Sequence, residues 1–130
     1  MRITLLGAGA WGTALAIHFA KQHHQVRLWA RDTEHVLQMK QSRSNERYLA
    51  GFVFPPQLTL ETDLQAAISA TELVLIATPV AGLRPTLEKI NPHIGAGIPI
   101  MTACKGFEVS TGKLPHQVVA DVLPQQQHII

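Results

Sequence analysis

Short apolar runs alternate along the whole chain with longer segments of helical periodicity. Two of the runs, Ile3–Leu6 and Leu73–Ala77, are almost continuously apolar, as in parallel strands that are covered on both faces. The pattern predicts strands at Arg2–Leu6, Gln25–Trp29, Leu58–Glu61, Leu73–Ala77, Ile98–Thr102 and His128–Ile130. It predicts helices at Trp11–Lys21, Thr33–Arg43, Asp63–Ala70, Ala81–Ile90 and Lys113–Leu123. Because strands and helices alternate, we expect an α/β fold with a doubly wound, mainly parallel sheet and helices on both faces.

Turn and capping residues fall where this scheme needs them. Asp32 or Thr33 suits the start of one predicted helix, and Asp63 suits the start of the next. The segment Ser44–Gln57 contains one glycine and two prolines, and we predict that it is the longest irregular stretch. The chain stops within an apolar strand pattern. We therefore expect residues 1–130 to be one domain of a longer protein.

Three glycines in G-x-G-x-x-G spacing follow the first predicted strand and open the first predicted helix. Gly7 allows a sharp turn, Gly9 leaves room for a pyrophosphate, and Gly12 lets the helix pack closely on the strand. Free N–H groups at the start of a helix favour an anion. This order predicts a dinucleotide-binding turn in a Rossmann-type sheet. The alternatives are glycines that serve packing alone and a secretory signal, which the glycines disfavour.

Composition narrows the function classes further. Hydrophobic residues make up 46% of the chain and charged residues 15%, which suits a buried core and excludes general disorder. The net charge of +2 comes from scattered basic residues, so we expect no nucleic-acid partner. No apolar run reaches the roughly 18 residues of a membrane-spanning helix, so we expect no membrane insertion. The single cysteine, Cys104, fits the cytoplasm, and the histidines lack the spacing of a metal site.

Two segments beyond predicted strand ends bear on chemistry, because ligands of open α/β sheets bind at that edge. Arg31 suits a 2′-phosphate and Asp32 suits ribose hydroxyls, which favours NADP(H) with NAD(H) as the alternative. A solvated Arg31 and a merely capping Asp32 are also compatible with the sequence. Lys105 follows the fifth predicted strand. It suits either a developing negative charge on a ketone oxygen or a phosphorylated substrate, and a solvated surface lysine is the open alternative.

Four segments in order carry a resemblance to a known family. They are Gly-Ala-Gly-Ala-Trp-Gly-Thr-Ala-Leu-Ala from Gly7, Val-Arg-Leu-Trp-Ala-Arg-Asp from Val26, Asn-Glu-Arg-Tyr-Leu-Ala-Gly from Asn45, and Lys-Gly-Phe-Glu from Lys105. Together they resemble the N-terminal half of bacterial NAD(P)-dependent glycerol-3-phosphate dehydrogenase, over nearly all of the chain. The resemblance implies reversible reduction of dihydroxyacetone phosphate to sn-glycerol 3-phosphate, which feeds phospholipid synthesis.

The resemblance also implies roles for individual residues. The implied cofactor contacts are Gly7, Gly9, Ala10, Trp11, Gly12, Arg31, Asp32, Tyr48 and Lys105. Tyr48 would close over the site, and Lys105 would meet both the nicotinamide and the substrate. The family's general base and its ligands for the substrate phosphate would follow residue 130. We therefore expect a dinucleotide-binding domain that is inactive without a catalytic second domain, in a parent enzyme for which the resemblance suggests a homodimer.

Two other functions compete with this interpretation. A stand-alone dinucleotide-sensing module fits the length of the chain. Another two-domain NADP-dependent reductase fits the layout but lacks the Trp-Gly-Thr-Ala-Leu-Ala signature. The Lys-Gly-Phe-Glu segment favours the dehydrogenase, because a sensor needs no cation at the nicotinamide end of its ligand.

Overall fold

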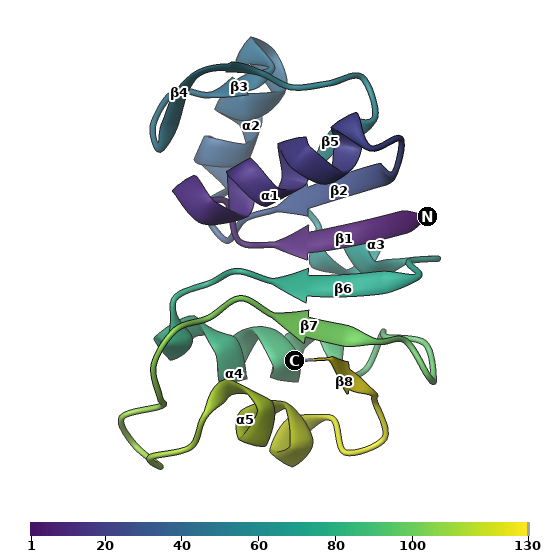
Figure 1. Ribbon diagram of the computed structural model, residues 1–130, viewed down its shortest axis with the longest axis vertical. Helices are drawn as coiled ribbons and strands as arrows, with labels where there is room; N and C mark the ends of the chain where they lie inside the picture. Colours follow the sequence, from purple (N-terminus) through teal and green to yellow (C-terminus); the bar gives the residue numbers. More distant parts are fainter. Residues whose placement is uncertain (130) are drawn as a thin grey trace.

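The computed structural model describes residues 1–129 and contains a six-stranded sheet in the order β5-β2-β1-β6-β7-β8, parallel throughout (Figure 1). Its strands are β1 (Arg2–Leu6), β2 (Gln25–Trp29), β5 (Leu58–Glu61), β6 (Leu73–Ile76), β7 (Ile100–Thr102) and β8 (His128–Ile129). The chain winds outward from β1 first to one edge of the sheet and then to the other. This order is that of the Rossmann fold and confirms the predicted doubly wound sheet.

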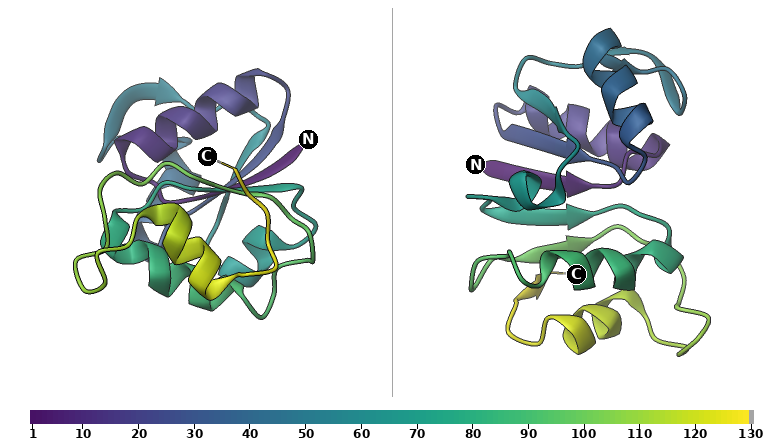
Figure 2. Two further views of the ribbon diagram at one scale, coloured as in Figure 1. Left: turned by 60° about the horizontal axis from the view of Figure 1, so that its bottom comes forward. Right: turned by 180° about the vertical axis from the view of Figure 1, so that it is seen from behind.

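Helices cover both faces of the sheet, as Figure 2 shows in its left view. They are α1 (Ala10–Lys21), α2 (Thr33–Ser42), α3 (Leu64–Ile68), α4 (Val80–Ile90) and α5 (Pro115–Val122). Leu5 of β1 belongs to the core under α1 and α2, whereas its neighbour Leu6 belongs to the core under α3, α4 and α5. Successive strand residues point to opposite faces, so a strand buried on both faces must be apolar at almost every position.

Several predicted boundaries shift for local reasons. Arg43 adopts a left-handed backbone (φ 55°) and ends α2 one residue early. α3 is shorter than predicted, because Asp63 is its cap rather than its first turn and Ala70 has a positive φ of 57°. Pro99 has no N–H for the ladder, and β7 begins after it. The other ends differ from the predictions by at most two residues. Ile130 lies outside the described residues.

The prediction that Ser44–Gln57 is irregular was wrong. β3 (Ser44–Asn45) pairs with β4 (Leu49–Val53) as a separate antiparallel hairpin, which lies beside α1 and α2 (Figure 1). Most of β4 is exposed on both sides, so its sequence lacks the alternation of apolar and polar positions that marks a half-buried strand. Across residues 1–129, none of the helices combines the length and the apolar character that crossing a membrane requires.

Candidate functional site

The turn between β1 and α1 lies at the centre of the sheet's carboxyl edge. Gly7 has a φ of 115°, and its N–H donates to the Trp29 carbonyl (2.8 Å). A Cβ on Gly7 would lie 2.8 Å from the Ala77 carbonyl, and a Cβ on Gly12 would lie 2.1 Å from the Gly7 oxygen. Both distances are shorter than any van der Waals contact. The fold itself therefore requires glycine at these two positions.

Gly9 differs from the other two glycines. It is the N-cap of α1, no side chain caps the helix there, and a Cβ would meet no atom within 4 Å. The first N–H groups of a helix have no acceptor within the helix. Ala10 and Trp11, which begin this helix, are exposed. An exposed helix N-terminus with open space before it fits a pyrophosphate.

Arg31 and Asp32 follow β2 at the same edge of the sheet. The Asp32 carboxylate accepts from the His35 N–H (3.3 Å) and pairs with Arg47 (3.1 Å). The bond from His35, with that from Arg47, lowers the pKa of Asp32. The predicted capping role of Asp32 is confirmed. Arg31 is exposed and forms no ion pair with any of residues 1–129, so its guanidinium is available to a ligand.

Tyr48 lies in the turn between β3 and β4. Its ring meets that of His35 edge-on, with 5.3 Å between centroids, and the Arg47 guanidinium lies 5.4 Å from the ring centre. The side chain remains 50% exposed. These contacts place Tyr48 on the same side of the site as Asp32. That it closes over a cofactor stays a prediction.

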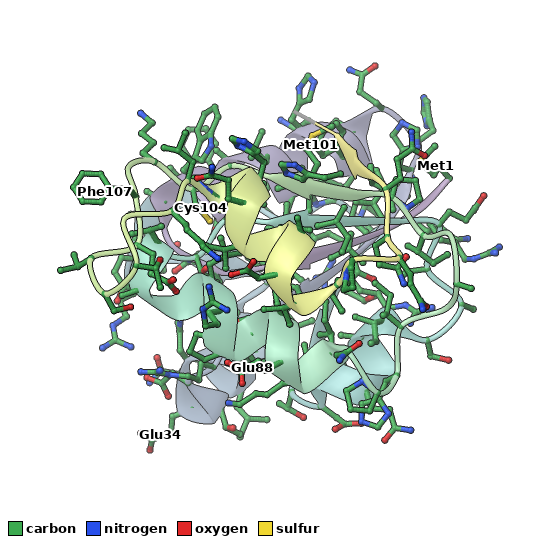
Figure 3. All side chains as sticks on the ribbon, turned by 90° about the horizontal axis from the view of Figure 1, so that it is seen from below. Met1, Glu34, Glu88, Met101, Cys104 and Phe107 are labelled. Carbon is green, nitrogen blue, oxygen red and sulfur yellow. The ribbon has the colours of Figure 1, made fainter. Side chains whose placement is uncertain are left out.

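Lys105 lies in the loop after β7 and is exposed. A series of contacts connects this loop to the glycine turn. The backbone of Gly7 lies against Thr78, whose hydroxyl is 3.9 Å from the Cys104 sulfur. Burial raises the pKa of the Cys104 thiol. Figure 3 shows Cys104 at the base of the loop and Phe107 projecting from it. The structure thus brings Lys105 to the edge that carries the glycine turn, two strands away from β1.

A partly buried ion pair between Glu108 and Arg84 anchors the loop that carries Lys105. Glu108 is only 8% exposed, and its carboxylate accepts from two nitrogens of Arg84 (2.9 and 3.0 Å) and from the Thr111 hydroxyl (2.6 Å). Arg84 also pairs with Asp121 (3.1 Å). The bonds from Arg84 and Thr111 hold the pKa of Glu108 below its usual value. The Lys-Gly-Phe-Glu segment thus combines an exposed cation with a buried anchor, a role for Glu108 that the sequence did not reveal.

The Glu108→Gln variant is expected to lower the thermal unfolding temperature at neutral pH by several degrees, because Arg84 loses one of its two charged partners, the one that is buried. The pKa of Glu108 in the folded state lies below its ordinary value of 4.5. The pair therefore stabilises the fold above that value, and this stabilisation is lost as the pH falls through the folded-state pKa. The difference between wild type and variant should shrink as the pH is lowered. Circular dichroism melts from about pH 7 to about pH 3 measure it.

Glu88→Gln is the matched control for this prediction. Glu88 lies on α4, the helix that carries Arg84, but its side chain is exposed (Figure 3). We expect its loss to leave the unfolding temperature unchanged, because exposed charges contribute little. A difference between wild type and Glu108→Gln that stays constant across the pH range would contradict the assignment of the ion pair.

Two hollows lie away from this edge. One, of about 360 Å³, is lined by residues at the amino ends of β2 and β5, including Gln25 and Gln57. The other, of about 450 Å³, is lined by residues such as Thr71 and His93, before β6 and after α4. Ligands of open α/β sheets bind at the carboxyl ends of the strands, so we assign neither hollow to a dinucleotide.

Comparison with known proteins decides the family. Residues 2–130 match the family described as NAD-dependent glycerol-3-phosphate dehydrogenase N-terminus. The chain belongs to this glycerol-3-phosphate dehydrogenase family. The resemblance inferred from the glycine turn and the Lys-Gly-Phe-Glu segment is thereby confirmed.

Individual members of the glycerol-3-phosphate dehydrogenase family agree with this match. The glycerol-3-phosphate dehydrogenase, NAD(P)+, of Dechloromonas aromatica is 46% identical over 126 residues, which cover 97% of this chain and 38% of the relative. That of Aromatoleum aromaticum is 49% identical over 123 residues, 95% of this chain and 37% of the relative. The crystal structure of the enzyme from Coxiella burnetii superposes with a TM-score of 0.93 at 35% identity, covering 98% of this chain and 39% of that one. This chain therefore spans 37% to 39% of the length of these relatives.

Proposed function

We propose that this chain is the dinucleotide-binding domain of a dehydrogenase that interconverts dihydroxyacetone phosphate and sn-glycerol 3-phosphate. The observation that carries the proposal is the uncapped, exposed N-terminus of α1 behind Gly9, in a member of this family. The names of the relatives, which specify glycerol-3-phosphate and NAD(P)+, support the substrate and the cofactor class. The proposed setting is the cytoplasm, where the product supplies phospholipid synthesis.

The residues at the carboxyl edge suit the parts of a nicotinamide dinucleotide, which when bound donates or accepts a hydride. The open space at Gly9 admits the pyrophosphate, and the first N–H groups of α1 donate to it. Ala10 and Trp11, the exposed first residues of α1, would line the cofactor. Arg31, beyond β2, would meet the adenosine end. Lys105, beyond β7, would lie towards the opposite, nicotinamide end.

Lys105 is the group proposed to act on the substrate. Reduction of a ketone places negative charge on its oxygen, and a fixed ammonium group stabilises that charge. The same cation could instead bind the substrate phosphate. At the nicotinamide end of this edge, Lys105 is an exposed cation that suits a phosphorylated substrate.

The enzyme assay is direct. The full-length protein is incubated with NADPH or NADH and dihydroxyacetone phosphate, and the loss of reduced cofactor is followed by absorbance. Glyceraldehyde 3-phosphate, an isomer with the same phosphate group, serves as the control substrate, and we expect turnover with the ketone alone. Cofactor binding without turnover of dihydroxyacetone phosphate would refute the dehydrogenase and favour a dinucleotide-sensing module.

We propose NADP(H) as the preferred cofactor, because Asp32 is already engaged by Arg47 while Arg31 is available. The Arg31→Ala variant should raise the Kd of NADPH by about ten- to a hundredfold through loss of a charged hydrogen bond, and leave that of NADH nearly unchanged. Fluorescence titration of the full-length protein measures both constants. Lys40→Ala, an exposed cation on α2, is the control and should change neither. An equal rise in the Kd values of NADPH and NADH would contradict a contact between Arg31 and the 2′-phosphate.

A further inference from the structure

A buried asparagine links the glycine turn to the hairpin. Asn45, the last residue of β3, is 1% exposed. Its Nδ2 donates to the Ala8 carbonyl (3.0 Å) and to the Thr13 hydroxyl (2.7 Å). Its Oδ1 accepts from the Tyr48 N–H (3.3 Å) and lies 2.9 Å from His35 Nε2. Both donor hydrogens and both acceptor positions of the amide are therefore used.

Two of these partners fix the orientation of the amide. A peptide N–H can only donate and a carbonyl can only accept, so Tyr48 must face Oδ1 and Ala8 must face Nδ2. His35 Nε2 faces the same oxygen and therefore carries a proton. A flipped amide would oppose donor to donor and acceptor to acceptor. The network thus holds the glycine turn, the start of α1, α2 and the hairpin in one mutual arrangement.

The bond to Ala8 acts on the peptide that precedes Gly9. In a trans peptide the carbonyl and the following N–H point in opposite directions, so a carbonyl held towards Asn45 turns the Gly9 N–H away from it. Ala8 stands between two glycines, the residues whose backbones are the most permissive. The bond to Thr13 ties the first turn of α1 to the same amide. A single buried side chain thus restricts the part of the chain that glycine would otherwise leave free.

We propose that Asn45 is a positioning residue, which holds the turn from Gly7 to Gly9 in the conformation that receives a pyrophosphate. It lies buried behind the turn and acts through Ala8 and Thr13. The inference rests on the proposed dinucleotide binding at this turn. Its consequence is specific, because loss of Asn45 should weaken ligands that contain a pyrophosphate more than ligands that lack one.

Two probes test this consequence in the full-length protein. ADP-ribose contains the pyrophosphate, whereas adenosine 2′-monophosphate does not. Asn45→Ala should raise the Kd of ADP-ribose by about tenfold or more, because the turn must be ordered on binding. The Kd of adenosine 2′-monophosphate should change by less than about twofold, since its contacts lie beyond β2. Calorimetric titration measures both constants.

Thr4→Val is the matched control. The Thr4 hydroxyl donates a buried hydrogen bond to the Ala67 carbonyl (2.5 Å) on the opposite face of the sheet. Both substitutions remove buried hydrogen bonds and lower the unfolding temperature, but Thr4→Val should leave both Kd values unchanged. If Asn45→Ala does not fold, Thr13→Val replaces it as the test. This variant removes the hydroxyl that accepts from Asn45 Nδ2, at nearly constant side-chain volume. It should then raise the Kd of ADP-ribose by about threefold while sparing adenosine 2′-monophosphate.

The results of these titrations distinguish a failure of the role of Asn45 from a failure of the proposed dinucleotide binding. A wild-type protein that binds neither ADP-ribose nor NADPH would refute dinucleotide binding itself. A wild type that binds ADP-ribose, together with an Asn45→Ala variant of unchanged affinity, would overturn the role of Asn45 alone. Equal weakening of the two probes would show that Asn45 only maintains the fold, and it would overturn the inference as well.

Discussion

The Gly9→Val variant is expected to lose dinucleotide binding while keeping its fold. Gly9 has an extended backbone (φ −74°) that valine can adopt, and the space at its Cβ is open. The expected destabilisation is therefore below about 1 kcal/mol, the usual scale for an unfavourable N-cap. A branched side chain in this space blocks the approach of a pyrophosphate to α1. We expect the Kd of NADPH to rise by about a hundredfold or more, measured by fluorescence titration.

Two other glycine variants make this experiment decisive. In Gly12→Ala the new Cβ would lie 2.1 Å from the Gly7 oxygen, so we expect this variant not to fold. In Gly95→Ala the new Cβ would make ordinary contact with Ile98, at 3.5 Å, and both fold and binding should persist. Circular dichroism reports the fold of each variant. Unchanged NADPH affinity in a folded Gly9→Val protein would exclude a pyrophosphate at this turn.

Replacement of Lys105 by alanine is expected to lower kcat/KM for dihydroxyacetone phosphate by about two orders of magnitude in the full-length enzyme. In the proposed site this variant removes a cation close to the reacting oxygen, and such a loss corresponds to about 3 kcal/mol of transition-state stabilisation. The exposed Lys105 has no ion-pair partner within residues 1–129, so the fold should not change. Steady-state kinetics with NADPH measures the effect.

Whether the loss in kcat/KM comes from kcat or from KM identifies what Lys105 contacts. A fall in kcat that equals the fall in kcat/KM indicates a contact with the oxygen that becomes charged in the transition state. A rise in KM at constant kcat indicates a contact with the substrate phosphate. Lys89→Ala, an exposed cation in the last turn of α4, serves as the control and should leave both constants unchanged. Full activity of Lys105→Ala would remove Lys105 from the proposed site.

The sheet and its helices could be predicted because their signals are local. Leu73–Ile76 is apolar throughout, and Asp63 caps the helix that follows it in sequence, so each element carries its own evidence. The β3–β4 hairpin was not predicted, because β4 carries no such local signal. Residues 50–53 are exposed on both faces of β4, and no buried face imposes a pattern on them.

The sequence predicted only those parts of the site whose residues lie together in one short segment. The glycine turn combines a strand, a turn and a helix within a few residues, and the structure places it at the carboxyl edge. The roles of Asn45 and Glu108 were not predicted, because they depend on partners that are far away in the chain. Asn45 contacts Ala8, 37 residues earlier, and Glu108 contacts Arg84, 24 residues earlier. No periodicity or spacing rule connects such positions.

The central position of β1 has a consequence for the order in which this chain acquires structure during synthesis. β1 pairs with both β2 and β6, and Gly7 packs against Ala77. The contacts of the glycine turn are therefore incomplete until residues 73–77 have left the ribosome and paired with β1. Parallel pairing over such a separation is slow, because the entropy of loop closure is lost before contacts form. At about 5–20 residues per second, the nascent chain carries β1 with an open edge for several seconds. We therefore expect a dinucleotide to bind, and to stabilise, the completed domain.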